Sequence, residues 1–169
     1  MKNLLSARGL SLLEIMVSAL ILAFIVIGLT EVLNIGALTF PIDSAWLDLQ
    51  QQTRQAMEWM TKDLRETKKA DIQINVLNAD SDQITFNTVD QTQVKFYRDA
   101  SDANNDGRVD QVIYEYPAGT RKVLANYISR LKFSTGPAFI LRIEVRAAQT
   151  IRQKPLSFPL IEQVRLRNE

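Results

Sequence analysis

The chain of 169 residues contains no cysteine and no histidine. Without cysteine it can form no disulfide, and without histidine it lacks the Ser-His-Asp and Cys-His arrangements of nucleophilic catalysis. Zinc and nearly all transition-metal sites also depend on these two side chains, so such sites are excluded as well. Carboxylates alone could still support an enzyme, but the sequence nominates no pair of them. We therefore expect that the protein is not an enzyme.

An excess of charge of either sign is also missing. Lysine and arginine together number 20, and aspartate and glutamate number 19. Dedicated nucleic-acid-binding proteins normally carry a strong basic excess, so the composition argues against contact with nucleic acid. The sequence has no internal repeats or low-complexity tracts, and the part beyond its N-terminal segment is long enough for one compact domain with a core.

A long apolar run lies near the N-terminus, where residues 10–29 contain one charged side chain, Glu14. About 20 helical residues at 1.5 Å each are enough to cross the roughly 30 Å hydrocarbon core of a bilayer. Lys2 and Arg8 precede the run, and the positive-inside rule keeps them in the cytoplasm and sends the rest across. The sequence thus predicts a single membrane span followed by a large extracytoplasmic domain.

The order of features around Gly9 differs from that of an ordinary secretory signal, which is cleaved after its apolar segment. Here the candidate cleavage site, between Gly9 and Leu10, precedes the apolar segment, so the segment would be retained. Glu14 follows shortly after, and a carboxylate inside a span costs about 2.5–3.5 kcal/mol on insertion scales. A plain signal anchor, with Glu14 close enough to the interface to stay hydrated, is the alternative interpretation.

The basic leader, Gly9, Glu14 and the retained apolar helix together resemble the class III signal of type IV pilins and type II secretion pseudopilins. The resemblance implies that a prepilin peptidase cleaves after Gly9 and methylates the new N-terminus at Leu10, where this family most often has phenylalanine. It also implies that Glu14 pairs with the N-terminal amine of a neighbouring subunit. The partners would then be the inner membrane and other minor and major pilins or pseudopilins, with the domain first in the periplasm and then in a pilus or pseudopilus.

Residues 31–68 are predicted to continue the helix into the aqueous side. Pro41 is expected to interrupt or kink this helix, because proline fits poorly in a helix interior. Asp43 or Ser44 can cap the helix that follows. Beyond Pro41, one face carries residues at helical spacing that are expected to pack on a sheet; they are Ile42, Ala45, Trp46, Leu49, Thr53, Ala56, Met57, Met60 and Leu64.

From residue 70 onward the apolar pattern changes to a period of two, which is typical of strands. The expected strands are marked by Ile72, Ile74 and Val76; Ile84 and Phe86; Val94 and Phe96; Val112, Tyr114 and Tyr116; Leu131 and Phe133; Phe139, Leu141, Ile143, Val145 and Ala147; and Leu160, Glu162, Val164 and Leu166. Turn-forming residues separate them at 78–82, 102–110, 117–119 and 136–137.

These patterns predict an α+β fold in which a long N-terminal helix, half membrane-spanning and half amphipathic, packs on an antiparallel sheet. The expected division is a leader (1–9), a transmembrane or filament-core helix (10–30), its continuation (31–68) and a β-rich domain (69–169). The layout is similar to that of pilin domains, most of all PilW-type minor pilins and the J-class minor pseudopilin of type II secretion, with short similarities at 60–65 and 164–168.

The resemblance implies a structural minor pilin or pseudopilin that is assembled through its N-terminal helix. The alternative is a membrane-anchored, exported binding or adhesin domain displayed on a pilus. No exposed aromatic cluster marks such a binding surface, because the tyrosines and phenylalanines mostly follow the strand alternation. The sequence leaves open whether the system is a type IV pilus, type II secretion or a DNA-uptake relative.

One further motif lies in residues 102–110, which offer potential oxygen ligands at alternate positions and have Gly107 at the sixth position. Calcium loops have this pattern. The candidate ligands are Asp102, Asn104, Asp106, Arg108 through its backbone carbonyl, and Asp110. The twelfth position, where an EF-hand has a bidentate acid, is Ile113. Aspartate, asparagine and glycine are also favoured in solvated hairpin turns, so a structural calcium site and a plain turn are both consistent with the sequence.

Overall fold

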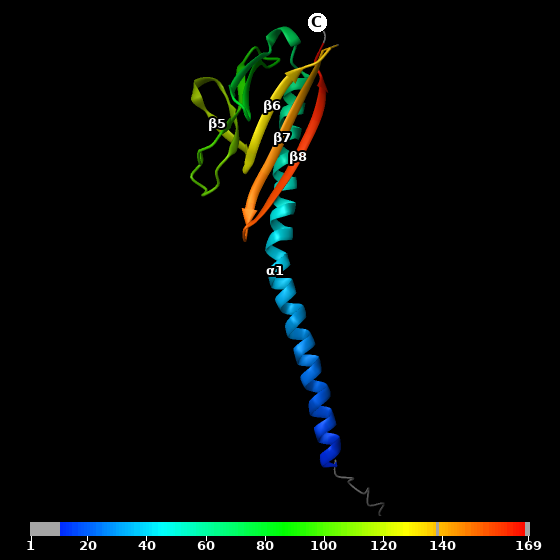
Figure 1. The fold of residues 1–169 in the computed structure, drawn as a ribbon. Helices are drawn as coiled ribbons and strands as arrows, with labels where there is room; N and C mark the ends of the chain where they lie inside the picture. Colours follow the sequence, from blue (N-terminus) through cyan, green and yellow to red (C-terminus); the bar gives the residue numbers. More distant parts are fainter. Residues whose placement is uncertain (1–10, 138, 168–169) are drawn as a thin grey trace, which may run out of the picture. The chain divides into compact units, whose positions relative to one another are not determined.

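The computed structural model describes residues 11–137 and 139–167 (Figure 1). The leader and the Gly9/Leu10 processing site lie outside the described residues. The chain divides into two compact units, Met1–Ile42 and Asp43–Glu169. Helix α1 (Leu12–Arg65) contributes its first part to the first unit and its remainder to the second.

Of the two effects predicted for Pro41, an interruption or a kink, the interruption is wrong, because α1 continues through Pro41 without a break. Asp43 and Ser44 lie inside α1, and no helix begins at either of them, so neither is an N-cap residue. A proline removes one N–H donor and crowds one preceding carbonyl, a local cost of about 3 kcal/mol. Extensive packing of the turns that follow, up to Leu64, favours the helical backbone there and offsets such a cost.

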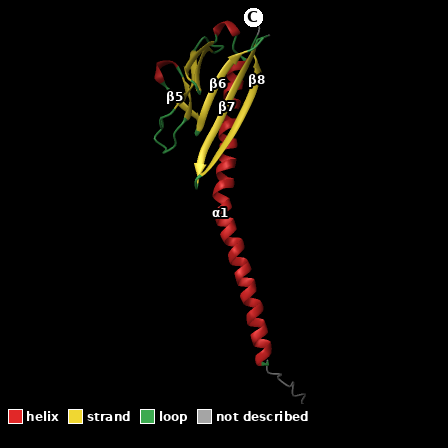
Figure 2. Cartoon of the chain, in the orientation of Figure 1, coloured by secondary structure: helices red, strands yellow, loops and turns green. Residues whose placement is uncertain are grey.

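The second unit contains an eight-stranded sheet, shown in yellow in Figure 2. Two short 3-10 helices, Lys69–Asp71 and Pro117–Gly119, lie in its connections. The strands are β1 (Gln73–Asn78), β2 (Ser81–Asn87), β3 (Gln93–Asp99), β4 (Gln111–Glu115), β5 (Arg121–Ala125), β6 (Ile128–Thr135), β7 (Ile140–Ile151) and β8 (Lys154–Arg165).

The sheet is mixed, which corrects the prediction of an antiparallel sheet. Its order is β5-β4-β3-β2-β6-β7-β8, and β1 also pairs with β2. All named strand pairs are antiparallel except β2 and β6, which meet in parallel at Ser81 and Leu131. The sheet is therefore two antiparallel sets joined at one short parallel contact. No local sequence pattern predicts this parallel pairing, because β2 and β6 are distant in sequence.

Most of the predicted strands are confirmed, and the deviations have local causes. β5 was not predicted, because its two basic residues precede the apolar Val123, Leu124 and Ala125 without alternation. β8 begins earlier than expected and contains Pro155 and Pro159. Proline is tolerated in β8 because this strand forms one end of the sheet, where an outward N–H has no partner to lose.

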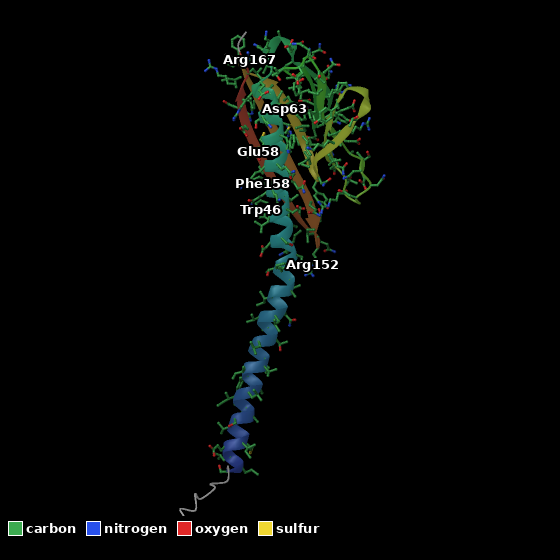
Figure 3. All side chains as sticks on the ribbon, turned by 180° about the vertical axis from the view of Figure 1, so that it is seen from behind. Trp46, Glu58, Asp63, Arg152, Phe158 and Arg167 are labelled. Carbon is green, nitrogen blue, oxygen red and sulfur yellow. The ribbon has the colours of Figure 1, made fainter. Side chains whose placement is uncertain are left out.

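The helix face predicted to pack on the sheet is confirmed beyond Trp46. Leu49, Ala56, Met57, Met60 and Leu64 are fully buried, and they share one core with the inward-facing side chains of the strands. At the margin of this core, the rings of Trp46 and Phe158 meet edge to face at 5.7 Å (Figure 3). The helix is thus fixed to the sheet by burial of its apolar stripe, as an amphipathic helix in an α+β fold should be.

Candidate functional site

The N-terminal part of α1 exposes nearly all its apolar side chains. Between residues 12 and 40, its large hydrophobic residues range in exposure from 50% at Val17 to 77% at Leu12. Burial of apolar surface is favourable, so an apolar environment would stabilise this segment. By length and composition α1 can cross a membrane, and its place near the N-terminus is compatible with a single span.

Glu14 lies in the first turn of α1. Its backbone N–H donates to the hydroxyl Oγ of Ser11 over 3.2 Å and to the Ser11 carbonyl over 3.0 Å. Ser11 and Glu14 are spaced as in a capping box, and a negative charge is favoured near the positive end of the helix dipole. The sequence analysis missed this local role, although the Ser-x-x-Glu spacing was visible in it.

The surface beside Glu14 is mostly apolar. Together with Ile15, Ser18, Ala19 and Leu22 it lines a shallow hollow along one face of α1. The small side chains of Ser18 and Ala19 leave room for another helix to approach closely. Among the described residues, Glu14 is thus the only charged one that lines this hollow, so a positively charged group of a partner that enters it could pair only with Glu14.

The loop between β3 and β4 is organised by its own side chains. The two carboxylate oxygens of Asp102 accept the backbone N–H groups of Asp106 at 3.1 Å and Gly107 at 2.8 Å. Asp106 accepts the N–H of Arg108 at 2.9 Å and a side-chain N–H of Asn104 at 3.0 Å. Gly107 has φ +81°, so the expected sharp turn is confirmed at a residue that adopts this backbone without steric cost.

Gln111, which the sequence analysis overlooked, holds this loop in place through side-chain hydrogen bonds. It is fully buried at the start of β4, and its amide Nε2 lies 2.8 Å from Asn104 Oδ1 and 3.1 Å from the Arg108 carbonyl. Its Oε1 accepts the backbone N–H of Ala103 at 2.8 Å. A buried amide needs such partners. A glutamine directly after a polar loop was the only sign of this role in the sequence.

The candidate calcium ligands are brought together only in part. Asp102, Asn104 and Asp106 gather in the loop, whereas Asp110 turns away and forms an ion pair with Arg98 on β3. Among the described residues, no three acidic side chains converge in a way that could hold a metal ion. The geometry fits a hydrogen-bonded turn better than a calcium cage, and calcium binding stays a prediction.

A cluster of ionisable side chains joins β3, β4 and β5. Glu115 accepts a hydrogen bond from the Tyr97 hydroxyl at 2.9 Å and forms ion pairs with Arg121 at 3.1 Å and Lys95 at 3.6 Å. These partners lower the pKa of Glu115, the Tyr97 hydrogen bond most of all. Burial, and then the bond to Glu115, raises the pKa of Tyr97 to about 12. Near neutral pH neither group changes protonation, so the cluster serves to tie the strands together.

Comparison of the chain with protein-family models, curated proteins and solved structures finds no match. The resemblance to pilins and pseudopilins that the sequence suggests stays a prediction, and it rests on the residues of the N-terminal segment and on the general layout of a long helix followed by strands.

Proposed function

We propose that the chain is a structural minor pilin or pseudopilin. After cleavage behind Gly9, it is assembled through α1 into a type IV pilus or a type II secretion pseudopilus. The observation that carries this proposal is the exposed apolar surface of α1 at residues 12–40, with Glu14 in its first turn. A membrane covers this surface before assembly, and helices of neighbouring subunits cover it afterwards.

The role of Glu14 follows from the energetics of a charge in an apolar environment. An unpaired carboxylate is costly there, and a neighbouring amine removes much of the cost. Cleavage after Gly9 creates such an amine at Leu10 of another subunit. Pairing would thus favour the assembled state over the separate subunit in the membrane, while Ser11 keeps the start of the helix formed.

Processing is tested by co-expressing the chain with a prepilin peptidase and measuring the mass of its N-terminus. We expect a mature chain that begins at Leu10, and an uncleaved chain for Gly9→Ala. The matched control is Gly28→Ala, because a methyl group there meets nothing within 4 Å. A Gly9→Ala chain that kept its leader and still entered filaments would refute the proposal.

Assembly is tested by the incorporation of Glu14→Gln into filaments. Glutamine retains the uncharged part of a capping box, so this change removes the charge and leaves the helix start largely intact. Glu31→Gln, on the exposed part of the same helix, is the control. We expect incorporation to be lost for Glu14→Gln alone. Equal incorporation of both variants would instead favour a membrane-anchored domain whose helix serves only as an anchor.

A further inference from the structure

The nearly neutral chain has a strongly uneven distribution of charge. Residues 71–125, which form β1 to β5, contain nine acidic and five basic residues. Residues 128–167, which form β6 to β8, contain eight basic and two acidic residues. In the sheet, β6, β7 and β8 occupy one side and β3, β4 and β5 the other, with β2 between them. The strand order therefore groups most of the acidic side chains in one part of the sheet and most of the basic side chains in the other.

The basic side presents its cations on the face of the sheet away from the core. Along β7, exposed Arg142 and Arg146 alternate with fully buried Leu141, Ile143 and Val145. We call this surface the basic face; it consists of Arg130, Lys132, Arg142, Arg146 and Arg165. Alternation along the strands places these residues on the same side of the sheet.

Several cations of the basic face lack an internal counterion. Arg130 pairs with Glu144 at 3.2 Å, and Lys132 pairs with Asp82 at 2.8 Å. Within the described residues, Arg142, Arg146 and Arg165 form no ion pair with a carboxylate. Arg146 also lies directly opposite Arg130 in the register of β6 and β7. Like charges at directly opposed positions destabilise a sheet, so an external anion would relieve a local cost.

The complementary surface consists of the last residue of β3 and the loop that follows it. We call Asp99, Asp102 and Asp106 the acidic loop. Their carboxylates accept N–H groups within the loop, and none of them forms an ion pair with a cation of the described chain. The end of this loop meets the start of β6, where the carbonyls of Val109 and Asp110 accept the N–H groups of Tyr127 and Ile128. Even so, within the described residues none of the three carboxylates pairs with a cation of the basic face of the same copy.

We infer that the basic face of one copy binds the acidic loop of a second copy. Opposite charges on two different surfaces of one domain favour a heterologous contact, which repeats in the same direction without closing. A net charge of +1 leaves little general repulsion between copies. The inference rests on the proposed filament function. It adds to that function that two or more copies of this chain would lie next to each other in the filament.

The absence of cysteine makes this contact directly measurable. Ala103→Cys places one thiol in the exposed acidic loop, and Ser134→Cys places another beside Arg142, which it faces across β6 and β7. The two full-length variants, purified separately in detergent and mixed under oxidising conditions, should give a disulfide-linked dimer. Neither variant alone should do so to the same extent, and about 0.5 M salt should reduce the yield because it screens exposed charges.

Charge reversal decides whether the contact is the one inferred. Arg142→Glu with Arg146→Glu in the Ser134→Cys chain should lower the dimer yield at least tenfold. Asp106→Lys in the Ala103→Cys chain should lower it too, and mixing the two reversed chains should restore it. Lys62→Glu, an exposed change on α1, is the control and should leave the yield unchanged. Restoration by the mixed pair also shows that both variants are folded.

An unchanged yield in the Arg142→Glu, Arg146→Glu chain would overturn the inference. A second result would also overturn the inference. If no dimer formed, and if the chain instead bound duplex DNA or anionic vesicles through Arg142 and Arg146, the basic face would serve a different polyanion. Because the measurement uses purified chain in detergent, it is independent of leader cleavage and of Glu14. Failure of the filament proposal and failure of this contact can therefore be told apart.

Discussion

Asp82 on β2 and Lys132 on β6 form an ion pair at 2.8 Å across the only parallel contact between strands in the described sheet. The second carboxylate oxygen of Asp82 accepts the backbone N–H of Phe133 at 3.0 Å. Asp82 is 3% exposed, so both of its bonds lie in a low-dielectric environment. A single buried carboxylate thus supplements the short register that joins the two antiparallel halves of the sheet.

Replacing Asp82 with alanine should strongly destabilise the domain. We expect a loss of about 3–5 kcal/mol, because the change leaves Lys132 and a buried N–H without their partner. Urea unfolding followed by tryptophan fluorescence measures this, since Trp46 and Trp59 both lie in the second unit. Asp80→Ala is the control: its carboxylate is 62% exposed and 3.9 Å from Arg130, so its loss should cost less than 1 kcal/mol. Equal effects of the two changes would contradict this account.

The packing of α1 on the sheet predicts a difference between its two faces. Met60 is fully buried in the core, and Met60→Ala should cost about 2–5 kcal/mol through lost burial and the cavity left behind. Leu47 is 64% exposed, and Leu47→Ala should change stability by less than about 0.5 kcal/mol. The same urea titration compares the two. A large effect at Leu47 would show that the opposite face of the helix is also packed.

The Glu115 cluster should make stability depend on acid pH. Its folded-state pKa is lowered, so its contribution is present above the unfolded value of about 4.5 and is lost as pH falls through the folded value. Glu115→Gln should therefore cost about 1–2 kcal/mol at pH 7, and the difference from the unmodified chain should shrink toward pH 3. Glu58→Gln, an exposed change on α1, should show no such trend. A difference that stayed constant from pH 7 to pH 3 would rule out the ionic part of this explanation.

Calcium binding by the 102–110 loop is decided by thermal melting. If the loop holds calcium, millimolar calcium should raise the melting temperature of the unmodified chain, because a ligand that binds only the folded state stabilises it. The same addition should have little effect on Asp106→Asn, and magnesium should have little effect on either chain. A hydrogen-bonded turn without calcium would instead show no shift in any of these samples.

The elements defined by local periodicity could be predicted from the sequence. The apolar stripe from Leu49 to Leu64 repeats at helical spacing, and the alternation through Leu141, Ile143 and Val145 repeats at strand spacing. Both patterns arise because an element must bury one face, so the side-chain order alone carries the information. β5 escaped prediction because a five-residue strand with two exposed basic residues at its start has no such alternation.

The parts of the candidate sites that lie within one short segment could be predicted from the sequence. The Ser11 and Glu14 spacing, the apolar run and the turn at Gly107 are all local, and each could be recognised in the chain. The partners of Asp110 and Asp82 could not be recognised. Arg98 lies on the preceding strand and Lys132 lies 50 residues away, and nothing in their surroundings marks them as counterions.

The sequence by itself determined a long apolar helix with one early carboxylate, an amphipathic continuation and a series of strands, because residue order specifies burial within each element. The tertiary structure decided what depends on neighbours distant along the chain: the helix that continues through Pro41, the parallel join of β2 and β6, and the pairing of Asp110 with Arg98. It also separated acidic from basic strands, since strand order, which no local pattern encodes, determines which charges share a surface.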